Sequence, residues 1–434
     1  MEIAVIGAGI AGVTTAWELV QDGHQVTVFD RRLAVAEEGS FANSGLIAPS
    51  SLIPWADPAM PRRARRQQLD TLAPLHRSRP MSLGERAWRW KRALLSSGTV
   101  ARRMSALREL ARYSHERLHT LVADLELDFE RTLGVLMLVR SAREQAALQP
   151  GLQLLRDLGI PFQELSPEQA RSVEPALNQE TAFHAAIVLP NDEAGNCRQF
   201  AQMLKAQAQA RGAQFVFGAE VQQLLPAAGA NLTHLPARLL ANMQVQLVGE
   251  AQARRFDAVV MCAGAGAGRL LKPLLRPLGF KLPLVTTHSY AISAQVREPQ
   301  HAPRSAVIDL RHNITLTRMG QRIRVGGGTV ELGGPPDQQN PKLVQKLYTV
   351  LHDWFPGAAL LSGNVQTWRG AQVMLPDNAP LLGATTIPGL WLNCAHGALG
   401  WTVSCGAARV LADEIQGQTG AIALKELGIT RLKR

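Results

Sequence analysis

Residues 1–30 read MEIAVIGAGIAGVTTAWELVQDGHQVTVFD: an apolar run, a glycine-rich turn, a helical pattern and a second apolar run that ends on an acid. This order predicts strand, turn, helix and strand, the context in which a GxGxxG motif indicates a dinucleotide site. Gly7 permits a tight turn, Gly9 leaves room for a pyrophosphate, and Gly12 lets the helix lie close to the sheet. The chain therefore contains a Rossmann-like nucleotide-binding unit.

Two further features of this stretch define the expected cofactor contacts. The helix starts near Ile10, so its free N–H groups and positive dipole end face the phosphates. Asp30 closes the second strand, where its carboxylate is placed to accept hydrogen bonds from an adenosine ribose. Arg31 and Arg32 would suit a 2′-phosphate, and hence NADP, but the carboxylate at position 30 argues against that cofactor.

The size and composition are those of a globular protein with two domains. The chain has 434 residues, 46% of them hydrophobic and 19% charged, which is too long for one ordinary core. Its four cysteines form neither a CxxC pair nor a Cys/His zinc pattern, so we expect reduced thiols, a cytoplasmic location and no metal. The apolar start belongs to the nucleotide turn rather than to a signal peptide, and no apolar run is long enough to span a membrane.

The formal net charge of +11 is concentrated in residues 60–112. Fourteen of the 46 Lys and Arg residues and only three of the 35 Asp and Glu residues lie there, so the rest of the chain is neutral. The runs RRARR at 62–66 and WRWKR at 88–92 would suit anionic lipid headgroups, and this option implies a peripheral position on the inner face of the plasma membrane. A solvated helical face and an RNA-binding face are the alternatives, and no DNA partner is expected.

Changes in hydrophobic period divide the chain into two interleaved domains. Helix 198–211 followed by strand 214–217 returns to the nucleotide-binding alternation, and the strand at 185–189 is expected to end at Pro190. Strand patterns without intervening helices fill 283–332 and predict an antiparallel sheet. The predicted fold class is α/β: a Rossmann-like domain of segments 1–60, 186–280 and 366–434, with an α+β substrate domain of segments 61–185 and 281–365 on a mostly antiparallel sheet.

Three glycine turns follow strands near residues 6, 263 and 393. In a doubly wound sheet the carboxyl ends of the strands share one edge, so these turns are expected to converge on one ligand. A nicotinamide half-site needs only the first turn, whereas three turns suit the larger FAD. The helix from Trp401 points its N-terminus into the last turn, where a positive dipole end would stabilise an anionic reduced flavin.

Five further motifs carry a family resemblance. In chain order they are Ser40-Phe-Ala-Asn-Ser-Gly45, Leu189-Pro-Asn-Asp-Glu-Ala-Gly195, Arg322-Ile-Arg-Val-Gly-Gly327, Pro376-Asp-Asn-Ala-Pro-Leu-Leu-Gly383 and Leu392-Asn-Cys-Ala-His-Gly-Ala-Leu-Gly-Trp-Thr402. With the N-terminal fingerprint, nearly the whole chain resembles the small subunits of bacterial D-amino acid dehydrogenases, within the D-amino acid oxidase-like FAD-dependent oxidoreductases. The resemblance implies oxidative deamination of a D-amino acid to a 2-oxo acid, with electrons passed to a membrane quinone.

The resemblance also implies a set of cofactor-binding residues. They are Ile6, Gly7, Ala8, Gly9, Ile10 and Gly12 at the pyrophosphate, Asp30 and Arg31 at the ribose, Ser40, Asn43, Ser44 and Gly45 at the isoalloxazine, Val221 at the adenine, Ala263 and Gly264 in the second turn, and His396, Gly397, Leu399, Gly400, Trp401 and Thr402 at the flavin's pyrimidine edge.

The chain departs from the family on the substrate side. Gln372 stands where the family has an arginine that clamps the substrate carboxylate, and an amide cannot replace that charge. The catalytic candidates are Gln372, Tyr290, His288 and His396, with Arg369, Arg311 or His288 as alternative sources of positive charge.

The sequence therefore predicts a FAD-dependent enzyme that moves a hydride from the α-carbon of a D-amino acid, or a related amine acid, to flavin N5. Such a reaction depends mainly on orientation and on the exclusion of water. A nicotinamide-dependent reductase and a flavin-dependent RNA-modifying protein that uses residues 60–112 remain as alternatives.

Overall fold

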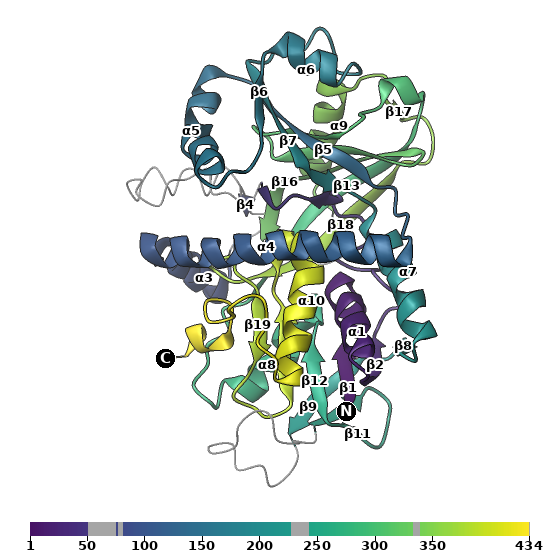
Figure 1. The fold of residues 1–434 in the computed structure, drawn as a ribbon, viewed down its shortest axis with the longest axis vertical. Coiled ribbons are helices and arrows are strands. Elements are labelled where there is room, and N and C mark those ends of the chain that lie inside the picture. Colours follow the sequence, from purple (N-terminus) through teal and green to yellow (C-terminus); the bar gives the residue numbers. More distant parts are fainter. Residues whose placement is uncertain (51–74, 77–80, 227–242, 333–338, 434) are drawn as a thin grey trace.

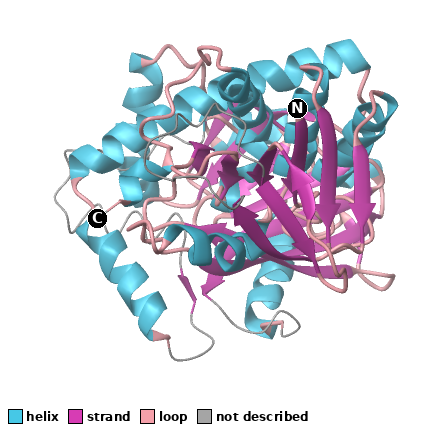
Figure 2. Ribbon diagram, turned by 90° about the horizontal axis from the view of Figure 1, so that it is seen from below, coloured by secondary structure: helices cyan, strands magenta, loops and turns pink. Residues whose placement is uncertain are grey.

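The computed structural model describes residues 1–50, 75–76, 81–226, 243–332 and 339–433. Two sheets are stacked along the long axis of the molecule, with a 29-residue helix lying across their boundary (Figure 1). In Figure 2 the strands run through the middle of the molecule and the helices lie around them. Among the described residues, no helix is both long enough and apolar enough to cross a bilayer.

The lower sheet has six strands in the order β19-β20-β12-β1-β2-β8. Its five parallel strands, read by their order in the chain, run 3-2-1-4-5, which is the doubly wound dinucleotide-binding order. β19 pairs antiparallel at one edge. The strands are β1 (Glu2–Ile6), β2 (Gln25–Asp30), β8 (Gln214–Phe217), β12 (Ala258–Met261), β19 (Leu381–Ala384) and β20 (Leu390–Cys394).

Alternate residues of β1 belong to two separate cores, one on each face of the lower sheet. Ile3 and Val5 pack under four helices: α1 (Ile10–Gln21), α4 (Ser97–Leu125), α7 (Cys197–Ala210) and α10 (Gly400–Gln416). Ala4 and Ile6 pack under α8 (Ala267–Leu275) and a three-stranded antiparallel sheet of β9 (Val221–Pro226), β10 (Met243–Leu247) and β11 (Arg254–Phe256). Both faces are covered, as a parallel sheet requires.

The upper sheet is mostly antiparallel, as the sequence predicted, with parallel pairs only where β14 meets β5 and β16 meets β4 among the described strands. Its path is β17-β13-β16-β15-β14-β5-β7-β3, and β4, β6 and β18 pair beside it. The strands are β3 (Leu46–Ile47), β4 (Leu75–His76), β5 (Thr132–Val139), β6 (Gln163–Leu165), β7 (Ala185–Ala194), β13 (Val285–Val296), β14 (Ala306–Asp309), β15 (Ile314–Met319), β16 (Arg322–Leu332), β17 (Ala359–Leu360) and β18 (Gln366–Met374). Helices α5 (Ala142–Asp157), α6 (Pro167–Val173) and α9 (Pro341–Trp354) pack on it.

Strands from all three expected nucleotide-binding segments meet in the lower sheet. The boundaries of the five segments stay a prediction. One expectation is wrong: β7 continues through Pro190 to Ala194. Pro190 is tolerated because it lies at the irregular pairing with β5, beyond the last residue paired to β6 and before the first paired to β3.

The basic region 60–112 is only partly described, and its run at 62–66 lies outside the described residues. The described part forms α3 (Leu83–Leu94) and the first half of α4, with a break after Leu94. Three of its arginines are paired within the chain: Arg103 with Asp377, Arg102 with Glu426 and Arg112 with Glu116. Part of the expected positive surface is therefore neutralised internally.

Candidate cofactor and substrate site

A cavity opens at the carboxyl ends of β1, β12 and β20, where the strand order reverses. Residues of all three glycine turns line it, so the predicted convergence is confirmed. Sixteen of the expected site residues face the cavity: Ile6, Gly7, Gly9, Ile10, Asp30, Arg31, Ser40, Asn43, Val221, Ala263, Gly264, Gln372, His396, Gly397, Gly400 and Trp401. The others, Ala8, Gly12, Ser44, Gly45, His288, Tyr290, Leu399 and Thr402, lie outside its lining.

The first turn needs its glycines for steric reasons. Gly7 has φ of +105°, and a Cβ there would lie 2.7 Å from the Cys262 carbonyl oxygen. A Cβ on Gly12 would lie 1.8 Å from the Gly7 carbonyl oxygen, which is backbone and cannot move aside. Gly12 therefore lies outside the cavity lining, and its lack of a side chain lets α1 approach the turn.

The cavity reaches the N-terminus of α1, where the sequence predicts the pyrophosphate. The Ile10 N–H donates to Ser40 Oγ at 3.1 Å, so the serine marks where an acceptor sits at this helix end. Asp30 accepts hydrogen bonds from the Ala8 N–H at 2.6 Å and the Arg32 N–H at 2.7 Å. Burial nevertheless raises the pKa of its carboxyl above the ordinary value. Its position fits the expected ribose contact.

The two arginines after Asp30 do not form a 2′-phosphate site. Both pair with Glu38: Arg31 Nη2 lies 2.5 Å from its carboxylate and Arg32 Nε lies 2.9 Å from it. The Val221 carbonyl accepts a hydrogen bond from Arg269 Nη2 at 2.8 Å. Val221 lines the cavity, and its contact with the adenine stays a prediction.

Ser44 and Gly45 support the cavity wall from the side of the upper sheet. The Thr317 hydroxyl donates to the Ser44 carbonyl at 3.3 Å, and the Gly195 N–H donates to the Gly45 carbonyl at 2.9 Å. Gly45 has φ of +78°, and a Cβ there would lie 2.1 Å from Met319 Cε. These contacts hold the loop that carries the cavity-lining residues 40 and 43 against the upper sheet.

His396 is held by a buried hydrogen-bond chain that sequence reasoning missed. The Thr15 hydroxyl donates to the Ala11 carbonyl at 2.6 Å and accepts from Asn393 Nδ2 at 2.9 Å. Asn393 Oδ1 therefore faces His396 Nε2, 2.8 Å away, and the imidazole must donate there. Burial lowers the pKa of His396 to about 4, so the ring is neutral at pH 7 and carries its lone pair on Nδ1.

The residues that follow His396 in the last glycine turn are held by contacts within the turn and with the upper sheet. Gly397 has φ of +57°, and the Leu399 N–H donates to the His396 carbonyl at 3.1 Å. Trp401 packs edge-on against Phe129 with ring centroids 6.0 Å apart. The Thr402 hydroxyl donates to the carbonyl of residue 46 at 3.4 Å, which joins α10 to the upper sheet.

Gln372 is the predicted catalytic residue of the upper sheet that reaches the cavity. Its Nε2 donates to Ser289 Oγ at 3.3 Å, across the pairing of β18 with β13. Ser289 is a second polar group on this face, and no sequence pattern singled it out. The two together offer hydrogen bonds but no formal charge.

Tyr290 and His288 are placed differently. Tyr290 lies in the core under α9, where its hydroxyl donates to Glu331 at 2.7 Å and accepts from the Asn340 N–H at 3.0 Å. His288 is buried, with 5% of its surface exposed. This geometry gives neither residue a place in the cavity lining, so their substrate roles stay predictions that it does not support.

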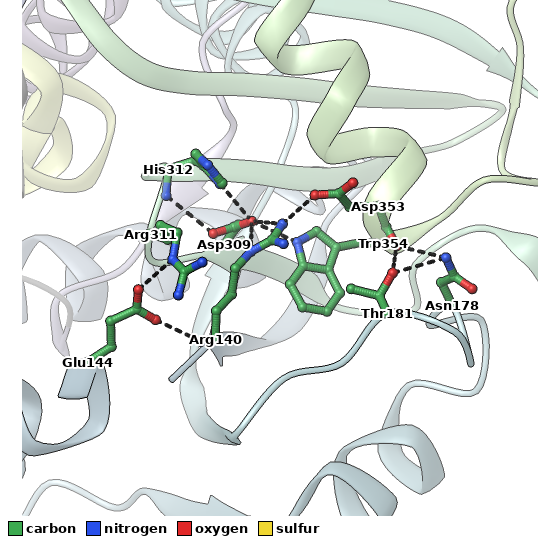
Figure 3. Close-up of polar contacts among 9 residues, drawn as sticks. All are labelled: Arg140, Glu144, Asn178, Thr181, Asp309, Arg311, His312, Asp353 and Trp354. Atoms are coloured by element: carbon green, nitrogen blue, oxygen red, sulfur yellow. Dashed lines mark hydrogen bonds and ion pairs between the residues drawn. The ribbon is translucent and has the colours of Figure 1, made fainter. Parts of the chain in front are cut away.

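The arginines considered as substitutes for the missing clamp are paired elsewhere. Arg369 forms a buried ion pair with Glu331 at 3.1 Å. Arg311 pairs with Glu144 of α5 at 2.6 Å (Figure 3). This geometry does not support the expectation that either supplies the substrate's counter-charge, because an ion pair already occupies each guanidinium.

The strand order and the three-turn cavity together define a dinucleotide-binding protein. The family model described as FAD dependent oxidoreductase, abbreviated DAO, matches residues 2–414. A D-amino acid dehydrogenase of Rhodopseudomonas palustris is 35% identical over 99% of this chain and 98% of its own length. The chain belongs to the DAO family of FAD-dependent oxidoreductases. FAD is therefore the cofactor, in place of a nicotinamide.

Solved structures agree on the fold. Glycine oxidase from Geobacillus kaustophilus has a TM-score of 0.74 at 18% identity, covering 99% of this chain and 98% of that one. L-α-Glycerophosphate oxidase from Mycoplasma pneumoniae, solved with FAD bound, has a TM-score of 0.69 at 16% identity, covering 98% of this chain and 96% of that one. The cavity observed here suits that cofactor, since it is glycine-walled and begins at a helix N-terminus.

Proposed function

We propose that this enzyme oxidises D-amino acids, or closely related amine acids, to 2-oxo acids. The observation that carries the proposal is Gln372, a polar side chain of the upper sheet that lines the cavity. The family resemblance implies that this is the position of the carboxylate clamp. Relatives named D-amino acid dehydrogenase, at 35–36% identity over 99% of the chain, support the substrate class. An uncharged clamp suits a substrate that binds less tightly or carries a further anchor.

We propose that the cavity-lining residues of the three turns hold the cofactor, with the fingerprint at the pyrophosphate and the last turn at the flavin. FAD supplies the hydride acceptor when it is bound. The Gln372 amide, steadied by Ser289, would hold the substrate carboxylate and so aim the Cα–H bond. His396, neutral and fixed by Asn393, would present a hydrogen-bond acceptor at the cavity wall.

The natural electron acceptor is proposed to be a quinone reached at a membrane surface. Leu83, Trp90 and Leu94 are 82%, 64% and 57% exposed and lie on one face of α3, since seven and eleven residues return to the same side of a helix. The basic residue Arg86 belongs to the same helix, and apolar and basic groups together are the pattern of an interfacial helix on anionic lipid.

The buried side of α3 leads back to the cofactor cavity. Trp88 packs with Met374 in a small core. Met374 in turn lies against the last glycine turn, where a Cβ on Gly397 would be 3.5 Å from its Cε. A membrane contact through α3 would therefore bring a lipid-soluble acceptor close to the flavin site.

The substrate proposal is tested by the visible spectrum of the FAD-loaded protein, recorded anaerobically before and after addition of D-amino acids. Bleaching of the oxidised flavin bands by D- but not L-amino acids is the expected result. Bands that persist with every D-amino acid would reject the substrate class, while the yellow protein would still report the bound cofactor.

The role of Gln372 is tested by Gln372→Arg. A guanidinium restores a charge-assisted pair with the carboxylate, worth ~1.5–3 kcal/mol, so affinity for simple D-amino acids is expected to rise by about tenfold or more. The matched control is Gln366→Arg on the same strand, which is exposed and outside the cavity lining. Affinity that is unchanged in Gln372→Arg, or raised equally by the control, would contradict the clamp assignment.

The membrane proposal is tested by cosedimentation with vesicles that contain phosphatidylglycerol. The double variant Trp90→Ser, Leu94→Ser is expected to lose most of the binding, because it removes the exposed apolar face of α3. Leu133→Ser is the control, since Leu133 is 64% exposed on a different element. Retained binding in the double variant would reject α3 as the contact.

A further inference from the structure

We propose that the enzyme binds one divalent transition-metal ion of the zinc class between α4 and β7, at His115, His119 and Glu193. Among the described residues, this is the group whose ligand atoms cluster closely enough to hold an ion, all within 4.8 Å of one another. The three side chains lie outside the lining of the FAD cavity. The metal site is therefore separate from the FAD site, and the proposal does not depend on the identity of the substrate.

The spacing of the ligand atoms matches a tetrahedral ion. His115 Nε2 and His119 Nε2 lie 3.3 Å and 3.2 Å from Glu193 Oε1. Ligands bound to zinc at ~2.0–2.1 Å in tetrahedral geometry are roughly 3.3 Å apart, so both distances fit two edges of one coordination sphere. The two imidazoles, whose ring centroids are 4.3 Å apart, come from one face of α4 because residues four apart share a face.

A hydrogen-bond explanation leaves these groups incompletely satisfied. His119 is within hydrogen-bond distance of Glu193, but His115 Nε2 is buried and makes no hydrogen bond. Glu193 Oε2 is also buried without a hydrogen bond, although Arg131 Nε lies 3.4 Å away. A cation between the three side chains would use the lone pairs of both imidazoles and of the carboxylate together.

The charge and accessibility of the cluster suit a metal ion. Glu193 is fully buried, at the inner end of the cluster. The side chain of His119 is 46% exposed, so an ion can reach the site from solvent. Two imidazoles and one carboxylate form a zinc-type donor set that leaves a fourth position for water, and calcium and magnesium prefer all-oxygen sites.

The experiment is equilibrium dialysis of untagged, FAD-loaded protein against buffered Zn²⁺, with bound zinc measured by plasma emission. Wild type is expected to bind one zinc ion per chain. His119→Ala is expected to weaken binding by at least about 10–100-fold, the loss that even outer-shell partners of a metal cause. The side chain of His119 is largely exposed, so the variant is expected to fold and to keep its flavin spectrum.

The matched control is His301→Ala, which removes an exposed histidine that lies 3.9 Å from a single glutamate, Glu298. It is expected to bind zinc as wild type does. Wild type that binds no zinc, or that binds it no more tightly than His119→Ala, would overturn the site. A yellow His115→Ala variant that keeps full zinc affinity would overturn it as well.

Discussion

At the scale of single residues, the close approach of Gly12 to Gly7 makes the sharpest prediction. Gly12→Ala is expected to abolish FAD retention, because its Cβ would lie 1.8 Å from a backbone oxygen. Gly268→Ala is the matched control: this glycine is also in the first turn of a helix, but a Cβ there meets nothing nearer than 3.7 Å. The control is expected to keep its flavin and to gain up to ~1 kcal/mol of helix stability.

Retention is measured as flavin absorbance per protein after gel filtration. Equal flavin content in Gly12→Ala and wild type would show that α1 can shift away from the turn, contrary to the packing described. A parallel loss in Gly268→Ala would mean that any alanine in these helices disturbs the site.

The sequence alone supported the cofactor half of the site better than the substrate half. The backbone geometry of a glycine turn depends on a few neighbouring residues, so the spacing of the glycines was enough to assign Gly7 and Gly397 to turns. The direction in which a strand side chain points depends on the neighbouring strands. The sequence around Tyr290 therefore did not indicate that this side chain faces the core under α9. The role of Asn393 in holding His396 could not be predicted either, because it depends on a contact with Thr15, 378 residues away in the sequence.

At the scale of elements, a buried ion-pair network ties β5, β14 and α9 together (Figure 3). Arg140 lies 2.6 Å from Asp309 and 2.7 Å from Asp353, and the Trp354 indole donates to Asp309 at 2.9 Å. Burial by itself would raise the pKa of Asp309. Hydrogen bonds from His312, Arg140 and Trp354 outweigh burial and hold that pKa well below its usual range.

Asp309→Ala is expected to destabilise the protein by about 3–5 kcal/mol, because it leaves the partly buried guanidinium of Arg140 without its closest partner. Asp353→Ala removes the more exposed partner, leaves Asp309 in place, and should cost well under half as much. Chemical denaturation of both variants checks this order. Equal losses would show that the network has no dominant partner.

Element positions were largely predictable, and the exception has a local cause. Helix 198–211 was expected from its periodicity, and α7 spans Cys197–Ala210. β7 was expected to end at Pro190, but the strand continues through that residue at an irregular pairing, where no described partner strand requires an N–H donor at this position. Whether a strand tolerates a proline depends on where the neighbouring strands end. The sequence of the strand itself does not contain that information.

At the scale of the whole molecule, acid is expected to weaken the fold because His396 is buried in its neutral form. The pKa of His396 is about 4 in the folded protein against 6.5 for an ordinary histidine, so the unfolded chain binds more protons between these values. Its contribution to stability is complete above pH 6.5 and is lost as pH falls towards 4, a change on the order of 3 kcal/mol.

Thermal unfolding of wild type and His396→Gln across roughly pH 4.5–7 measures this contribution. Glutamine keeps a donor for Asn393 but does not titrate, so the variant is expected to show a shallower decline in melting temperature. Identical pH dependence in the two proteins would mean that His396 has an ordinary pKa in the folded state.

The strand order of the lower sheet has a consequence for how the enzyme is made. β1 is translated long before the strands beside it, because its neighbour β12 and the next strand, β20, lie more than 250 and 380 residues later. At about 5–20 residues per second the ribosome needs roughly 20–80 s to connect them. During that interval the apolar faces of β1 have no complete sheet to enter, and the last glycine turn does not yet exist. We therefore expect flavin to bind only after β20 and the last glycine turn have been translated.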